Sequence, residues 1–261
     1  MGVVERRLEA AAAMPGGAET DLLCGVVGVG HVGVVRGDQP RDIDEILGLC
    51  GSSCAGVHEF RLVRFNGIVD ASGWDQRYSD EERVWSAEPN VFVAQYLAGR
   101  TPGVAIDLGA GEGRNAVWLA QQGWEVTAVD FSAVGLAKAR AMAREAEVEL
   151  ATVVDDVDSF EPTGPVDLVL LSYLQIPDDQ QRRLLRRVAR WLNVGGAVFV
   201  VAHDKTNVEL GQGGPQDPAV CYTVEQTVSA LDGLEVHFAE VLDRDGALDT
   251  VVLAQRPVSP G

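Results

Sequence analysis

From residue 90 onward, apolar segments of strand length alternate with amphipathic segments of helical period, and this alternation limits the possible folds. The predicted strands are Val104–Leu108, Glu125–Asp130, Val148–Val154, Val166–Leu171, Ala197–His203, Leu234–Val241 and Leu248–Ala254. The predicted helices are Val91–Leu97, Arg114–Gln122, Ala133–Glu145, Asp179–Leu192 and Val224–Leu231. Such alternation is typical of parallel strands joined by right-handed crossovers, with helices on both faces of the sheet.

The last two predicted strands have only Asp243–Gly246 between them, which is too short for a helix. Two strands joined in this way form an antiparallel hairpin. The sequence therefore predicts an α/β fold with a seven-stranded, mostly parallel, doubly wound sheet that ends in a C-terminal antiparallel hairpin.

Residues 1–68 differ in composition from the rest of the chain. They hold 12 of the 29 glycines and three of the four cysteines, and they show no sustained hydrophobic period. We expect a poorly ordered N-terminal extension over residues 1–68 and one folded domain over residues 69–261. A second interpretation is that residues 1–68 are not translated and that Val69 is a GTG start.

The net charge argues for a small-molecule partner. Lys and Arg number 21 against 39 Asp and Glu, giving −18, and such a charge repels a nucleic-acid backbone. No apolar run approaches the ~18 residues of a membrane helix, and Met1–Ala13 lacks the apolar core of a secretion signal. We therefore expect neither nucleic acid nor a membrane as a partner.

The cysteines do not form the disulfide framework, with an even number of cysteines, that is typical of short secreted chains. They therefore favour a reducing compartment, the cytoplasm. They are Cys24, Cys50, Cys54 and Cys221. The spacing Cys50-x3-Cys54-x3-His58 is one ligand short of a closed zinc site, so no metal is predicted.

Two glycine-rich loops are candidate nucleotide sites. Gly28–Gly33 matches G-x-G-x-x-G, but the following Val34–Pro40 does not form the helix that such a site requires. A nicotinamide-dependent oxidoreductase that uses this loop remains an alternative.

The second loop, Asp107–Arg114, follows a predicted strand and leads directly into a predicted helix. Its glycines let the backbone approach a ligand, and free N–H groups at a helix start favour an anionic group such as a carboxylate. The next strand ends at Asp130, 17 residues past Gly113, where a carboxylate can accept hydrogen bonds from a ribose diol. The alternative role of Asp130 is to cap the turn at Phe131–Ala133.

With this loop the chain resembles class I S-adenosylmethionine-dependent methyltransferases, which have a Rossmann-like fold. The glycines follow Asp107 as G-x-G-x-G, and Asp156 lies after the third strand, where an acid in this family binds the adenine amino group. The resemblance implies S-adenosylmethionine as the cofactor. It implies these cofactor-binding residues: Trp85, Asp107, Gly109, Ala110, Gly111, Arg114, Asp130, Phe131, Asp156, Val157 and Ser172.

A closer resemblance, over about residues 73–257, is to the branch of tellurite-resistance-type and thiopurine-type methyltransferases. It rests on Trp74–Tyr78, Trp85–Asn90, Gly111–Ala116 and Ser172–Pro177. In this branch the segment around Trp85 closes over the cofactor. The alternative is that Trp74, Tyr78 and Trp85 only anchor the N-terminal flank.

The implied reaction is an in-line methyl transfer to a small-molecule acceptor. Tyr173 and His203 are the candidate catalytic residues, since both lie where strands are expected to end beside the cofactor loop. His203 is alternatively a structural histidine, and His203–Thr223 is either a substrate wall or a connection. Methylation of nucleic-acid bases is disfavoured because no Pro-Pro-aromatic motif follows the fourth strand. A non-catalytic S-adenosylmethionine-binding protein is the alternative function.

Overall fold

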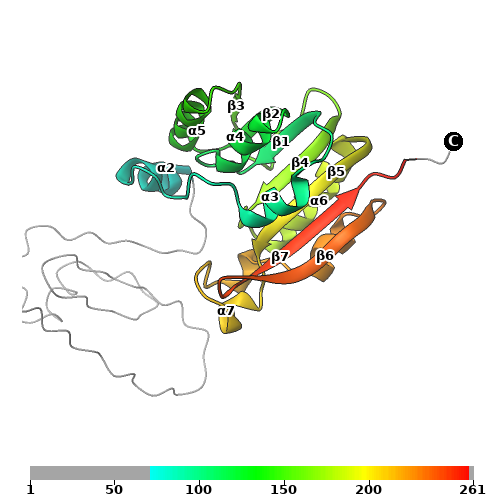
Figure 1. Ribbon diagram of the computed structural model, residues 1–261. Coiled ribbons are helices and arrows are strands. Elements are labelled where there is room, and N and C mark those ends of the chain that lie inside the picture. Colours follow the sequence, from blue (N-terminus) through cyan, green and yellow to red (C-terminus); the bar gives the residue numbers. More distant parts are fainter. Residues whose placement is uncertain (1–70, 259–261) are drawn as a thin grey trace, which may run out of the picture. The chain divides into compact units, whose positions relative to one another are not determined.

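A computed structural model describes residues 71–258 and shows one twisted seven-stranded sheet (Figure 1). The strand order is β3-β2-β1-β4-β5-β7-β6. The strands are β1 (Val104–Leu108), β2 (Glu125–Asp130), β3 (Ala151–Val154), β4 (Val166–Ser172), β5 (Leu192–His203), β6 (Glu235–Arg244) and β7 (Ala247–Gln255). Strands β1 to β5 are parallel, and β7 is antiparallel to both β5 and β6. The predicted α/β fold with a C-terminal hairpin is confirmed.

Helices cover both faces of the sheet. They are α2 (Ala71–Asp80), α3 (Val91–Leu97), α4 (Arg114–Gln121), α5 (Ala133–Glu145), α6 (Asp178–Trp191), α7 (Asn207–Leu210), α8 (Val224–Ala230) and the 3₁₀ helix η2 (Pro218–Val220). One core cluster joins α6 and α8 to alternate strand residues such as Val198 and Val200, and the other joins α3, α4 and α5 to Ala197 and Phe199. Strands β1, β2, β4, β5 and β7 thus bury both of their faces, which explains their nearly continuous apolar runs, whereas the edge strands β3 and β6 stay partly exposed.

Two strands begin three or more residues from the predicted position, and β6 ends at Arg244 rather than Val241. Strand β3 begins at Ala151 rather than Val148, because Glu147 has φ 54° and Val148 donates its N–H back to Ala143 O. Strand β5 begins at Leu192, directly after α6, because Leu192 already pairs with Val166 of β4. The sequence also predicted neither α2 nor α7.

Several sequence predictions concern residues outside 71–258. They are the extension over residues 1–68, the Gly28–Gly33 loop and the Cys50–His58 cluster. Within residues 71–258, no helix combines the length and apolarity needed to cross a membrane.

Candidate functional site

The loop after β1 depends on glycine for backbone shape and for space. Gly111 and Gly113 have φ of 54° and 81°, which side chains disfavour. A Cβ at Gly111 would lie 2.5 Å from the Tyr78 hydroxyl, and one at Gly113 would lie 2.5 Å from Ala139 Cβ. The loop therefore packs tightly under α2 on one side and against α5 on the other.

Asp130, the last residue of β2, is hydrogen-bonded to that loop. Its Oδ2 accepts the N–H of Gly111 at 2.8 Å, and its Oδ1 accepts the N–H of Ser132 at 2.8 Å. Burial raises the pKa of this carboxyl, and the two N–H groups oppose that effect. Each oxygen keeps a second lone pair, so the local turn that the sequence suggested does not preclude a ligand.

Asp107, at the end of β1, is buried without a partner. It is 1% exposed, and neither carboxylate oxygen has a hydrogen-bond partner among residues 71–258. Burial, helped by the negative charge of Asp130, raises its pKa to about 7 against the opposing effect of Arg114. Ser172 Oγ, at the end of adjacent β4, is also buried without a partner in the described chain. Since buried polar groups normally have partners, both are suited to a ligand with hydrogen-bond donors.

Asp156 and Val157 follow β3, next to the end of β2. The N–H of Asp155 donates to Asp130 O at 3.2 Å, which brings the two strand ends together. Asp156 is exposed and accepts the N–H of Asp158 at 2.8 Å, whereas Val157 is buried. Candidate acids thus lie at the ends of three adjacent strands, as the sequence predicted.

Glu112 ties a segment of the chain to the glycine loop. Its carboxylate is 2% exposed and accepts the N–H groups of Val84 and Trp85, each at 3.0 Å. Lys138 of α5 donates to the same carboxylate at 2.8 Å and to Glu81 O at 2.6 Å. No sequence pattern singled out Glu112 or Lys138, although Glu112 stands between two glycines of the loop.

The aromatic residues of the N-terminal flank form one cluster. The ring of Trp74 lies 5.4 Å from that of Tyr78 and 6.2 Å from that of Trp85, and the Arg77 guanidinium lies near both tryptophan rings. Tyr78 is buried against Gly111, whereas Trp85 is 38% exposed. The cluster therefore combines a buried anchor, Tyr78, with an exposed ring, that of Trp85.

Three other cofactor candidates lie around the loop. Gly109 and Ala110 both donate N–H groups to Val129 O, at 2.8 and 3.1 Å. Arg114 begins α4, and its Nη1 donates to Ser86 Oγ at 3.0 Å. Phe131 is half-buried directly after Asp130.

Tyr173, just after β4, belongs to a polar cluster. It has φ 55°, an unusual value for a tyrosine. Its hydroxyl donates to Asp249 Oδ2 at 2.6 Å and accepts from Arg244 Nε at 2.9 Å and from Asn90 Nδ2 at 3.1 Å. Burial and the negative Asp249 raise the pKa of Tyr173, so its hydroxyl is neutral at pH 7.

His203 lies beside the same carboxylate. Its Nδ1 is 3.1 Å from Asp249 Oδ1, and its ring centre is 5.0 Å from that of Tyr173. Burial disfavours the charge on Asp249, but the nearby His203 ring and hydrogen bonds from Tyr173 and Arg244 outweigh it and lower the pKa. The cluster is therefore organised around one ionised, fully buried acid.

The segment after β5 covers this cluster. A Cβ at Gly214 would lie 2.8 Å from the His203 ring. Asn207 Oδ1 accepts the N–H of Leu248 at 2.7 Å, and the N–H of Gln212 donates to Gly246 O at 2.9 Å. This segment therefore both forms a wall over His203 and connects to the β6–β7 hairpin.

Residues 105–196 match the family model described as a methyltransferase domain. This segment of the chain is similar to methyltransferase domains. The match agrees with the sequence prediction of a methyltransferase that uses S-adenosylmethionine.

Curated relatives are similar to part of the chain. The ribosomal RNA small subunit methyltransferase C of Alcanivorax borkumensis is 36% identical over 44% of this chain and 38% of its own length. The ubiquinone biosynthesis O-methyltransferase of Alkalilimnicola ehrlichii is 32% identical over 55% of this chain and 59% of its own length. The chain thus spans less than two thirds of either relative.

The solved structure of N-methyltransferase NodS from Bradyrhizobium japonicum, in complex with S-adenosyl-L-homocysteine, has the same fold. It is 14% identical, covers 70% of this chain and 97% of its own, and has a TM-score of 0.59. The Rossmann-like methyltransferase fold is therefore confirmed.

Proposed function

We propose that the chain transfers the methyl group of S-adenosylmethionine to a small-molecule acceptor. The observation that carries this proposal is the unpartnered, buried carboxyl of Asp107 beside a glycine loop that admits no side chain. S-adenosylmethionine supplies an electrophilic methyl group on a positively charged sulfur, and its amino group suits a buried acid. The acceptor forms a bond to the methyl carbon as the sulfur–methyl bond breaks, leaving S-adenosylhomocysteine.

The residues around the loop would hold the cofactor. Asp130 has lone pairs left for the ribose hydroxyls, and Asp156 with Val157 would bind the adenine. Asp107, Ser172 and Arg114 would surround the methionine part. Glu112 accepts the backbone N–H of Trp85 and so fixes this residue near the loop, where the Trp85 ring would cover the cofactor. Exclusion of water and alignment of the acceptor with the methyl group are expected to contribute most of the rate enhancement.

The polar cluster would serve the acceptor. His203 would accept the acceptor's proton on Nε2, while Asp249 fixes the ring through Nδ1 and stabilises the imidazolium that forms. Tyr173, neutral and held by Asn90 and Arg244, would orient the acceptor.

The chemistry of the chain favours a small molecule over nucleic acid. The net charge of −18 opposes binding to a phosphate backbone, although one curated relative is named as a ribosomal RNA methyltransferase. We place the chain in the tellurite-resistance and thiopurine branch on the motifs Trp85–Asn90 and Ser172–Pro177, and we expect it to act in the cytoplasm.

Calorimetric titration of S-adenosylmethionine into the full chain tests the cofactor site. We expect micromolar binding that Asp130→Asn weakens by about tenfold or more, since hydrogen bonds to a charged group contribute about 1.5–3 kcal/mol. Asp179→Asn removes one exposed carboxylate on α6 and should leave affinity unchanged. Absence of binding to the folded chain would refute the proposal.

A panel of thiol, selenide, tellurite, phenol and amine acceptors then tests turnover by the release of S-adenosylhomocysteine. Binding without turnover on any of these acceptors would favour the non-catalytic alternative. Binding of NAD(P) that depends on Gly28–Gly33 would instead favour the oxidoreductase.

A further inference from the structure

Two of the five arginines of α6 have partners, and Arg182, Arg186 and Arg190 have none among the described residues. Arg183 pairs with Asp179 on the surface, and Arg187 donates to Glu161 Oε1 at 3.0 Å and to nearby backbone carbonyls. Arg186 and Arg190, four residues apart on one helix face, make no hydrogen bond or ion pair with any residue of the described chain.

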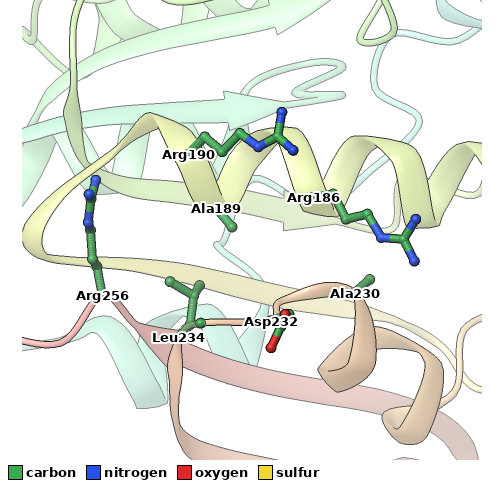
Figure 2. Close-up of a pocket in the computed structure, with 8 residues that line it drawn as sticks. Arg186, Ala189, Arg190, Ala230, Asp232, Leu234 and Arg256 are labelled. Atoms are coloured by element: carbon green, nitrogen blue, oxygen red, sulfur yellow. The ribbon is translucent and has the colours of Figure 1, made fainter.

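Arg186 and Arg190 line a cavity of about 400 Å³ together with Arg256, which follows β7. Figure 2 shows Arg186 and Arg190 projecting from α6, with Arg256 on another side of the cavity and Asp232 across from the helix. Alanine and leucine side chains lie between the charged groups. Arg256 is fixed in part by donation from Nη1 to Leu192 O at 2.7 Å.

The cavity concentrates positive charge on an acidic chain. Three arginines and one acidic residue, Asp232, line it, while the whole chain carries −18. Guanidinium groups are weakly hydrated and bind carboxylates and phosphates through two parallel hydrogen bonds. Since Arg186 and Arg190 lack partners in the described chain, an anion would satisfy donors that now face solvent.

The placement of the charges indicates the shape of the ligand. Arg186 and Arg190 project from α6 and Arg256 lies on another side of the cavity, so a single small anion would meet only one or two of the three. The apolar surface between them suits a hydrocarbon or aromatic body, and the volume is that of a small-molecule site. We propose that this cavity binds a small organic anion with at least two carboxylate or phosphate groups on an apolar body.

This site is separate from the proposed methyl-transfer site. Strand β5 runs for 12 residues from Leu192, beside the cavity, to His203 in the polar cluster. At ~3.3 Å per residue, the two ends lie roughly 35 Å apart. Binding in the cavity can therefore be measured whether or not the chain transfers methyl groups.

Calorimetry with benzene-1,3,5-tricarboxylate, a flat apolar ring that bears three carboxylates, tests the proposal on the full chain at low salt. We expect it to bind at least tenfold more tightly than benzoate or tripolyphosphate, which lack the extra charges and the apolar body respectively. Arg186→Gln and Arg190→Gln should each weaken binding by about tenfold, as expected for loss of a charge-assisted contact.

The matched control is Arg183→Gln, which removes the same charge from the same helix outside the cavity. Arg183→Gln should change the affinity for benzene-1,3,5-tricarboxylate by no more than about twofold, because exposed ion pairs contribute little. Equal binding of benzoate or tripolyphosphate would contradict the proposal, and so would an equal loss of affinity in Arg183→Gln. Unchanged melting temperatures would show that the variants remain folded.

Discussion

Asp107 combines complete burial with a titratable charge, and this combination predicts pH-dependent stability. Its pKa is about 7 in the folded chain and ~4 in an unfolded chain, so folding takes up a proton between these pH values. Stability should therefore fall as the pH rises from about 4 to about 7. Asp107→Asn should remove this loss and stabilise the chain by up to about 4 kcal/mol at pH 8.

Denaturant unfolding of both proteins between pH 5 and pH 8 measures the effect. The difference in the free energy of unfolding between Asp107→Asn and the wild type should grow with pH. The variant should also bind S-adenosylmethionine more weakly than the wild type. A difference that stays constant across this range would show that Asp107 does not titrate there. Asp179→Asn, at an exposed carboxylate, is the control.

Asp249 is expected to act through His203 rather than on the acceptor itself. Asp249→Asn should lower kcat by about 10²-fold or more for phenol or amine acceptors, which must lose a proton, and much less for thiolates, which need none. The affinity for S-adenosylmethionine should stay unchanged, since Asp249 lies in the polar cluster.

Rate profiles against pH with both acceptor classes measure the role of Asp249. Asp243→Asn in the same hairpin is the matched control, because an amide oxygen can still accept the N–H of Gly246. An equal loss of kcat for both acceptor classes would argue for a structural role of Asp249.

At the scale of elements, Glu112 joins three parts of the chain: the glycine loop, α5 and the segment 81–85. Glu112→Gln should weaken the contact with Lys138 and place an amide donor against the N–H groups of Val84 and Trp85. We expect hydrogen exchange at these two amides to accelerate by about tenfold or more, with weaker cofactor binding, because a buried charge pair is broken.

Hydrogen-exchange mass spectrometry on peptides that cover residues 81–90 gives the readout. Glu125→Gln, at the exposed start of β2, should leave exchange in this segment unchanged. Unaltered protection of residues 84 and 85 in Glu112→Gln would mean that the segment is held by its aromatic cluster alone.

Elements with strong local determinants were predictable from the sequence. The predicted bounds of α3 and α5 match the structure, where Asn90 and Ser132 accept the first helical N–H groups. The early start of β5 was not predictable locally, because it depends on the pairing of Leu192 with Val166.

The same division applies to the site. The glycine loop and the acids after β1, β2 and β3 follow from short strand–loop–helix patterns. The polar cluster does not, because Tyr173 meets Asn90 from 83 residues away and Asp249 from 76 residues away. The one local indication was an acid inside the otherwise apolar strand Ala247–Gln255.

At the scale of the whole molecule, the net charge of −18 should weaken the folded state through repulsion between acidic groups. Because salt shortens the screening length from ~30 Å at 0.01 M to ~8 Å at 0.15 M, the melting temperature should rise between 10 and 300 mM NaCl. Thermal scans of the full chain at constant pH measure this. A melting temperature that falls with added NaCl would show that attractive ion pairs dominate instead.

Strand β7 runs against β5, so its first residues lie at the sheet edge where β4 and β5 end. The hairpin thus delivers Asp249 and Arg244 to Tyr173 from outside residues 105–196, the stretch that resembles other methyltransferases. Under the proposed function, the residues that meet the acceptor thus come partly from the hairpin, outside the stretch that matches the family model. We therefore expect changes in the turn at Asp245–Gly246 to alter the choice of acceptor more than the use of the methyl donor.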